Sequence, residues 1–305
     1  MEGVNYFAPP EEFNLSNNLI IKSSYTKLPN GKLKSNFGDL IRSTILVNCL
    51  EEDFLWVTDR RAKDLLKCFV RPSRIITLED LDSSLEQKNI YNLDNYILNE
   101  NFFRKLKGEW KGFKYNGEKV SPENSLLAST IPYFNHETKK SWQQCLVEGL
   151  GFEWMEQDFL KPRIYSKDKD SIDIGLNYHV HPEWISKAWK KESWEELSSI
   201  IQNNYSFSWQ EGLDNFQQYY QWMNSCKLII TNDTLGLHLA SALRKKVIAI
   251  TGPTDNREFS YGRISFAKPP PRECMPCESP RCKINKPCLD EVIPQEITTL
   301  LSEIL

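Results

Sequence analysis

The chain has 305 residues, a formal net charge of −3 and 40% hydrophobic residues. This length favours two domains of ordinary size, and the charge gives no electrostatic reason to expect a nucleic-acid partner. No apolar run approaches the about 18 residues that a membrane-spanning helix needs, and the first residues do not resemble a secretion signal. We therefore expect a cytoplasmic protein with reduced cysteines and at most peripheral membrane contact.

Apolar runs alternate with helical patterns along the N-terminal half, which favours a doubly wound parallel sheet. We predict strands at 18–22, 54–58 and 73–78 and helices at 62–70 and from Asp39 through Leu50. Residues 80–90 are predicted to be helical, and 102–110 form an amphipathic segment. The segment 23–34 is polar, and Pro29-Asn30-Gly31 marks a turn within it.

The C-terminal half follows a charged, proline-bearing stretch, 160–171, which we interpret as a linker. The domains are then 1–165 and 166–305. Strands are predicted at 172–177, 228–230 and 247–250, and helices at 187–197, 216–226, 235–246 and 294–305. Between 200 and 216 no strand is predicted. The last helix is amphipathic.

The most informative stretch is the predicted strand–helix–strand unit at 227–256. Asn232, Asp233 and Thr234 are helix-start residues that end a buried strand. A helix N-terminus at the carboxyl end of parallel strands suits a phosphate group. Gly236 and Gly252 allow a ligand to approach the backbone closely. The alternative is that Asp233 only caps the helix and that Gly252-Pro253 is only a turn.

A cluster of cysteines precedes the last helix. Four of the eight cysteines follow a C-x2-C-x4-C-x5-C pattern: Cys274, Cys277, Cys282 and Cys288. In a reducing compartment this spacing favours a structural zinc ion held by four thiolates, and iron would accept the same ligands. The alternatives are free buried cysteines or a disulfide pair.

Three segments resemble glycosyltransferase family 9, the bacterial lipopolysaccharide heptosyltransferases. Asn232-Asp233-Thr234, His238-Leu-Ala and Gly252-Pro253-Thr254-Asp255 resemble its donor-site signature, although Leu235 stands where the family has glycine and Gly236 follows. Ser35-Asn-Phe-Gly38-Asp39 resembles its Ser-x-x-Gly-Asp loop. Lys187-x-Trp with the later Trp194-x-x-Leu resembles its Lys-x-Trp-Pro segment, with Lys190 in place of the proline.

The resemblance implies a GT-B type α/β fold, in which two Rossmann-like domains face each other across a cleft and the last helix packs back on the N-terminal domain. The segment 23–34 is longer than is usual in the family, which implies an extra flap before Asp39. The resemblance also implies an enzyme of lipopolysaccharide biosynthesis that transfers a sugar, ADP-heptose being the expected donor, to a hydroxyl of a glycan or other acceptor with inversion. Asp39 is then the general base, and no catalytic metal is expected. The implied donor-binding residues are Lys187, Asp233, Thr234, Leu235, Gly236, His238, Gly252, Pro253 and Thr254.

Without the resemblance, each of these residues has a plainer explanation. Gly38 and Asp39 are explained by a loop and a helix cap, and Lys187 by a solvated helix start. Two other functions also remain: a non-catalytic carbohydrate- or nucleotide-sugar-binding protein on the same scaffold, and a nucleotide-sugar epimerase. The first is favoured by Leu235 and by the short polar run 202–213, where the family has a strand that lines the nucleotide base.

Overall fold

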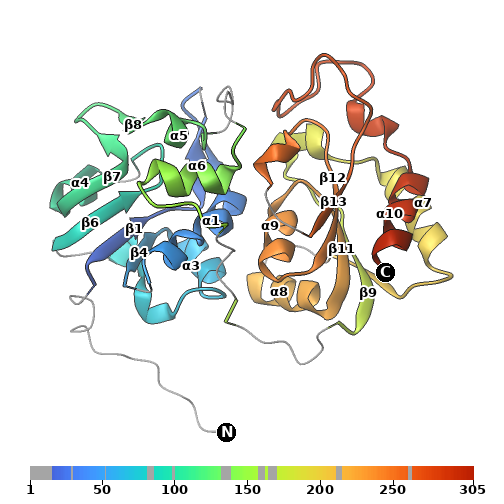
Figure 1. Cartoon of the computed structure of the whole chain (residues 1–305), viewed down its shortest axis with the longest axis horizontal. Coiled ribbons are helices and arrows are strands. Elements are labelled where there is room, and N and C mark those ends of the chain that lie inside the picture. Colours follow the sequence, from blue (N-terminus) through green and yellow to red (C-terminus); the bar gives the residue numbers. More distant parts are fainter. Residues whose placement is uncertain are drawn as a thin grey trace, which may run out of the picture. The chain divides into compact units, whose positions relative to one another are not determined.

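The chain divides into two compact units (Figure 1). Unit 1 comprises residues 1–131 and 146–163, and unit 2 comprises 132–145 and 164–305. The computed structural model describes residues 16–28, 30–51, 53–80, 86–97, 100–131, 139–156, 162–163, 170–210, 215–259 and 263–305. The predicted boundary between residues 165 and 166 lies outside these ranges.

Unit 1 contains a six-stranded sheet in the order β5-β4-β1-β6-β7-β8, parallel except for the β7–β8 pair. The strands are β1 (Asn18–Ile21), β4 (Leu55–Thr58), β5 (Ile75–Thr77), β6 (Glu86–Asn92), β7 (Lys107–Tyr115) and β8 (Val120–Pro122). The helices are α1 (Phe37–Ser43), α2 (Leu46–Cys49), α3 (Arg60–Leu66), η2 (Pro72–Arg74), η3 (Leu78–Asp80), α4 (Glu100–Lys105) and α5 (Ser125–Ala128). Helix α6 (Trp142–Gly149) spans the division between the units.

Strands β1, β4 and β5 confirm the predicted positions, whereas the helix predicted at 80–90 is wrong. Strand β6 lies there, paired with β1 and β7. This strand contains several polar residues, so its sequence does not show the apolar run of a buried strand. Their side chains instead form hydrogen bonds to neighbouring strands: Asn89 donates to Asn18 Oδ1 (2.9 Å) and Asn92 to Phe113 O (2.8 Å). The amphipathic segment 102–110 contains the end of helix α4 and the start of strand β7.

The segment before Asp39 forms a small antiparallel hairpin of β2 (Tyr25–Lys27) and β3 (Leu33–Ser35). Arg61 of α3 supports it, because its guanidinium donates to the Tyr25 hydroxyl (3.0 Å) and lies 5.2 Å from the centre of the Phe37 ring. The predicted extra segment is therefore an ordered hairpin attached to unit 1.

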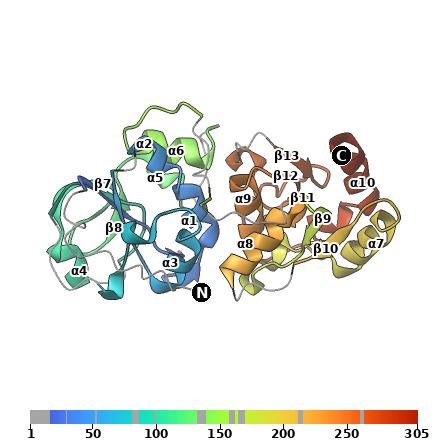
Figure 2. The same ribbon diagram turned by 90° about the horizontal axis from the view of Figure 1, so that it is seen from below.

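Unit 2 contains five parallel strands in the order β10-β9-β11-β12-β13. They are β9 (Ile172–Asn177), β10 (Phe207–Trp209), β11 (Cys226–Asn232), β12 (Lys246–Ile250) and β13 (Ile264–Ala267). The helices are η4 (Pro182–Lys187), α7 (Lys191–Ile201), α8 (Phe216–Ser225), α9 (Leu235–Ala242), η5 (Asn256–Glu258), η6 (Cys288–Glu291) and α10 (Pro294–Ile304). Helices α8 and α9 cover one face of the sheet and α7 and α10 the other (Figure 2).

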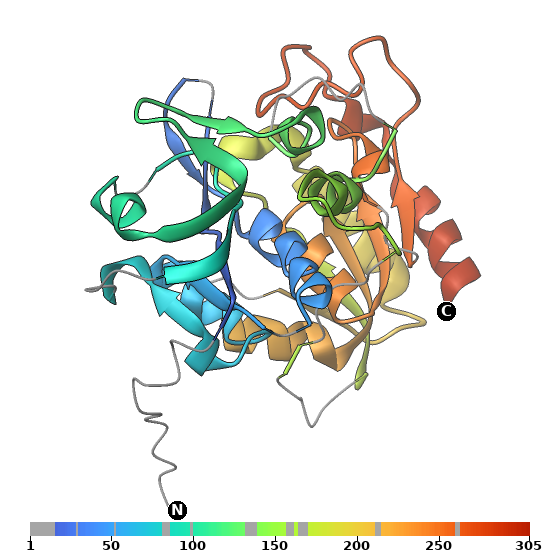
Figure 3. The ribbon, with the colours of Figure 1, turned by 60° about the vertical axis from the view of Figure 1, so that its left-hand side comes forward.

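One prediction for unit 2 needs correction. Strand β10 lies in the stretch 200–216, where no strand was expected, because Phe207 and Trp209 alternate with Ser208 and pack on the core. Helix α10 packs on α7, β12 and β13 (Figure 3), and its buried Ile297 and Leu301 belong to the core of unit 2.

Among the described residues, no helix is both long and apolar enough to cross a membrane.

Candidate functional site

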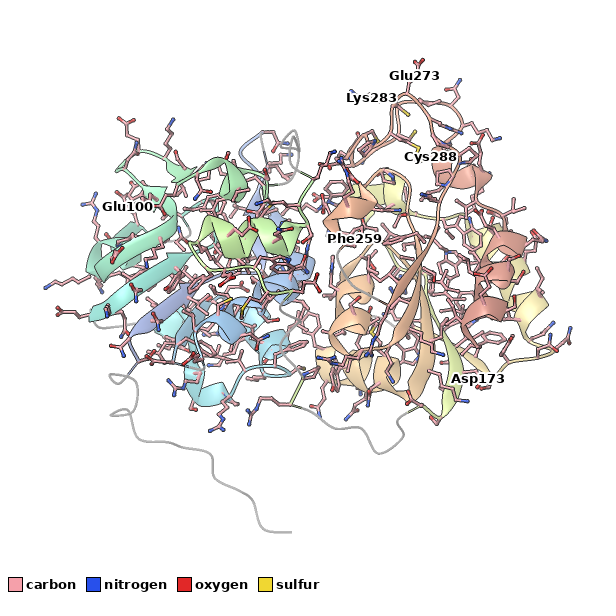
Figure 4. The ribbon with its side chains drawn as sticks, viewed as in Figure 1. Glu100, Asp173, Phe259, Glu273, Lys283 and Cys288 are labelled. Atoms are coloured by element: carbon pink, nitrogen blue, oxygen red, sulfur yellow. The ribbon has the colours of Figure 1, made fainter. Side chains whose placement is uncertain are left out.

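The candidate site lies at the carboxyl ends of β9, β11 and β12, which are adjacent and parallel and therefore end at one edge of the sheet. Helix α9 begins there. Its N-cap is Thr234, whose hydroxyl accepts from Gly236 N (3.3 Å), so only one of the three predicted helix-start residues caps the helix. Figure 4 shows Cys288 towards this end of the sheet and Asp173 at the opposite end.

Asp233 is the centre of the site. Its carboxylate, which is 5% exposed, accepts a short hydrogen bond from Lys187 Nζ and another from the Thr254 hydroxyl (2.5 Å). Burial by itself would raise the pKa of Asp233, but the charge of Lys187 and these two hydrogen bonds outweigh it and lower the pKa. The structure thus brings together three residues that lie far apart in the sequence, and Lys187 Nζ also lies 4.8 Å from the centre of the Trp184 ring.

Asn232 fixes the two segments that flank this centre. Its fully buried side chain accepts from Trp189 N (3.1 Å) and donates to Tyr178 O (2.9 Å). The end of β11 therefore positions both the segment that carries Lys187 and the segment that follows β9. Sequence reasoning assigned Asn232 only to the helix start; the signal for this role is an amide side chain at the end of a buried strand, which must find backbone partners.

A buried polar network supports the start of α9. Asn177 donates to the hydroxyls of Thr231 (2.7 Å) and Thr234 (3.3 Å) and accepts from the Tyr219 hydroxyl (2.9 Å). A Cβ atom at Gly236 would overlap the Asn177 amide and lie 2.7 Å from the Tyr219 oxygen. Gly236 is therefore required by packing against protein atoms, a reason that the sequence analysis did not give. Asn177 and Tyr219 were not predicted.

The second predicted glycine, Gly252, packs against the cysteine-rich loop. A Cβ atom there would lie 2.8 Å from Cys288 Sγ. The same loop is tied to both halves of the site, since Glu278 N donates to Pro253 O (2.8 Å) and the Ser186 hydroxyl to Ser279 O (2.5 Å). The loop therefore braces the turn after β12 and the segment that carries Lys187.

Leu235 and His238 complete the predicted donor residues. Leu235 is half-buried and opens α9. His238 is buried one turn later, with its ring centre 5.9 Å from that of Phe259.

The four cysteines do not form a tetrahedral set as the structure stands. Cys288 is buried, whereas the other three, Cys274, Cys277 and Cys282, are exposed. Burial raises the pKa of Cys288, and the neighbouring thiols of Cys277 and Cys282 add to that rise. Within the described ranges, no three His, Cys, Asp or Glu side chains converge as metal ligands.

Asp39 lies in unit 1, in the first turn of α1. The N-cap residue Asn36 accepts from Asp39 N (3.2 Å) and donates to its carboxylate (2.5 Å), and Arg42 Nη1 lies 3.4 Å from the other carboxylate oxygen. The side chain is 13% exposed. Asp39 is thus held in the first turn of α1 and retains some solvent contact, but the cap of this helix is Asn36, so the plainer explanation of Asp39 as the helix cap is wrong.

Comparison with known proteins places this geometry in context. Residues 212–286 match the model of glycosyltransferase family 9 (heptosyltransferase). The structure is similar to E. coli heptosyltransferase WaaC with ADP, at 12% identity and a TM-score of 0.62 over 94% of this chain and 100% of that one. E. coli ADP-heptose lps heptosyltransferase II gives 13% identity and a TM-score of 0.62 over 94% of this chain and 98% of that one.

A third similar structure is the bacterial iron-containing dodecameric glycosyltransferase TibC from enterotoxigenic E. coli. It gives 11% identity and a TM-score of 0.61 over 95% of this chain and 76% of that one. A search of curated protein sequences found no match. The chain therefore has the GT-B type fold of these solved glycosyltransferases, and its residues 212–286 are similar to glycosyltransferase family 9.

Proposed function

We propose that the protein is a glycosyltransferase that takes a sugar, heptose by analogy, from a nucleoside diphosphate donor. The observation that carries the proposal is the Lys187–Asp233–Thr254 cluster beside the N-terminus of α9. A cation, a hydroxyl donor and the positive end of a helix dipole at one sheet edge suit a diphosphate. Neighbouring structures are described as complexes with ADP and with ADP-2-deoxy-2-fluoro heptose, which supports ADP-heptose as the donor.

In this proposal, the acceptor hydroxyl loses its proton to Asp39 while its oxygen attacks the anomeric carbon from the face opposite the diphosphate. The C–O bond to the diphosphate breaks, and inversion follows from a single displacement. Lys187 and the amino end of α9 offset the charge that develops on the leaving diphosphate. Asp233 holds Lys187 in place and lies where it can accept from sugar hydroxyls.

The finer expectations are part of the same proposal. They are a glycan or other hydroxyl acceptor, a role in lipopolysaccharide biosynthesis, a cytoplasmic location and no catalytic metal. A structural zinc or iron ion at Cys274, Cys277, Cys282 and Cys288 is supported by their spacing in the sequence. Binding would require the exposed part of the loop to close, and no catalytic step depends on it.

The test is the release of ADP from ADP-heptose in the presence of candidate acceptors, with Asp39→Asn as the decisive variant. Loss of the base should lower turnover by about 100-fold or more and leave the Kd for ADP unchanged. Asp64→Asn, an exposed aspartate on α3, is the matched control and should retain full activity. Near-normal turnover of Asp39→Asn would remove Asp39 from this role.

A second candidate function is donor binding without transfer. It is favoured by the contacts of the Asp39 carboxylate with Asn36 and Arg42. ADP binding with no sugar transfer to any acceptor, and no effect of Asp39→Asn, would establish it.

A further inference from the structure

A ladder of aromatic rings crosses unit 2 from its core to its surface. Trp189 and Trp194, which are 3% and 2% exposed, are in edge contact with ring centres 5.2 Å apart. Trp194 contacts Trp209 at 6.2 Å, and Trp209 contacts Tyr178 at 5.4 Å, both edge to face. Tyr178 is stacked on His179 with ring centres 4.1 Å apart. The buried rings thus support a pair of rings at the surface.

The surface end of the ladder lies at the same sheet edge as the candidate diphosphate site. Tyr178 and His179 directly follow β9, and Trp209 ends the neighbouring strand β10, in register with Leu176. On its other side β9 pairs with β11, which leads into Asp233 and α9. Adjacent strands lie about 4.8 Å apart, so β10 and β11 are separated by about 10 Å, a span that one nucleotide can bridge.

Backbone contacts couple the two places. Asn232 donates to Tyr178 O (2.9 Å), and the next residue is Asp233. The position of Tyr178 is therefore fixed by the strand that carries the phosphate-binding residues. Yet Tyr178 is 39% exposed, although an apolar ring of this size would gain by burial. An exposed, rigidly supported aromatic pair beside a phosphate site is suited to a flat ligand group.

We propose that Tyr178 and His179, backed by Trp209, form the stacking platform for the nucleobase of the donor. The inference rests on the proposed function and names the base-binding part of that site. Strand β10 is the last strand on this side of the sheet, so no neighbouring strand within the described residues covers its outer edge. Stacking uses the π-face that every base has, and its strength should follow ring area, so purine diphosphates should bind more tightly than UDP.

The experiment compares ADP with inorganic pyrophosphate by calorimetry, on the full chain and its variants. Tyr178→Ala should lower ADP affinity by about tenfold, the range measured for removal of one base–aromatic stack, and leave pyrophosphate affinity unchanged. His179→Ala should act in the same direction, and Tyr178→Phe should retain binding. Tyr115→Ala, at the end of β7 in unit 1, is the matched control.

Three results would overturn the inference. Unchanged ADP affinity in Tyr178→Ala would exclude stacking while leaving the diphosphate site intact. An equal loss of ADP and pyrophosphate affinity would mean that the variant disturbs the phosphate loops instead. If the unmodified protein bound neither ADP nor pyrophosphate, both this inference and the proposed function would fail. Thermal melts of each variant separate these results from misfolding, and the 39% exposure of Tyr178 makes folding of the variants the expected result.

Discussion

At the scale of single residues, the candidate site depends on a buried carboxylate with one cationic partner. Asp233 is 5% exposed, whereas the side chain of Lys187 is 18% exposed. A buried charge without a partner is strongly destabilising, because desolvation is no longer offset. In the free protein Lys187 neutralises Asp233, and a bound diphosphate would share the same cation. The pair therefore contributes to stability and, in our proposal, to donor binding.

Replacing Lys187 by Ala tests this coupling. We expect a loss of about 3 kcal/mol in the free energy of unfolding at neutral pH, the lower end for a broken buried pair. In the unmodified protein the pKa of Asp233 is lowered, so its contribution is present above the unfolded-state pKa and is lost as the pH falls through the folded one. Without Lys187, burial raises that pKa, and the variant should gain stability as the pH falls from about 7 to about 5.

Urea unfolding at several pH values measures the free energy of unfolding of Lys187→Ala. Lys191→Ala is the control, since Lys191 is 83% exposed. A variant whose pH dependence parallels that of the unmodified protein would show that the pair is not responsible.

Gly236 gives a second residue-scale prediction. In Gly236→Ala the new methyl group meets Asn177 and Tyr219, and overpacking of this kind costs about 1–3 kcal/mol. Because α9 starts at Leu235, ADP affinity should fall as well. Asn177→Ala removes one of the two clashes, so the double variant should lose less stability than the sum of the losses in the two single variants. Strictly additive losses in urea unfolding would contradict the proposed clash.

At the scale of elements, the cysteine-rich loop is the part of unit 2 that braces the site. It bonds to Pro253 through Glu278 and to Ser186 through Ser279, and Cys288 packs on Gly252. At its base, Arg272 Nη2 pairs with Glu291 (3.0 Å) and Arg272 Nη1 donates to Lys286 O (2.8 Å). These contacts hold the two ends of the loop together and so fix the backbone that carries its free thiols.

We predict that the purified protein contains about one zinc or iron ion per chain, measured by elemental analysis. Cys277→Ser should abolish the metal and lower the thermal midpoint, because a bound ion stabilises the folded state by mass action. Cys68→Ser, at a buried cysteine of unit 1, is the control and should keep the metal. A metal-free protein with an unchanged midpoint in Cys277→Ser would identify the cysteines as free thiols.

At the scale of the whole molecule, two hydrophobic clusters of the described residues lie in different units. One surrounds β1, β4 and β6 of unit 1, with Phe102, Phe103 and Leu106 packed against the sheet. The other lies between the sheet of unit 2 and helices α7 and α10, with Trp189, Trp194 and Leu289. Each unit therefore has its own hydrophobic stabilisation, and a ligand confined to one unit stabilises that unit first.

Calorimetry with ADP tests this division. At an ADP concentration about 100 times Kd, the stabilisation is about 2.7 kcal/mol, which corresponds to a rise of about 5–10 °C in the melting of a unit of this size. We expect only the transition of unit 2 to move, with unit 1 as the internal control. An equal shift of both transitions would show that the chain unfolds as one cooperative body.

The sequence by itself was sufficient for the strand–helix–strand pattern at 172–177 and 227–250 and for the resemblance carried by Asp233, Thr234 and His238. Those features are local, since buried parallel strands are apolar runs and a helix start needs capping residues. It failed at β6 and β10, whose strand character comes from polar side chains satisfied by neighbouring strands and from aromatic rings packed on a distant core.

Only the tertiary structure decided what surrounds each site residue. The Lys187–Asp233–Thr254 contact joins three loops, the need for glycine at position 236 comes from Asn177 and Tyr219, and the placing of Tyr178 comes from Asn232. Each is a contact between segments that the chain itself separates by tens of residues. Propensity and periodicity describe neighbours along the chain, whereas burial, hydrogen-bond pairing and charge neutralisation are set by neighbours in space.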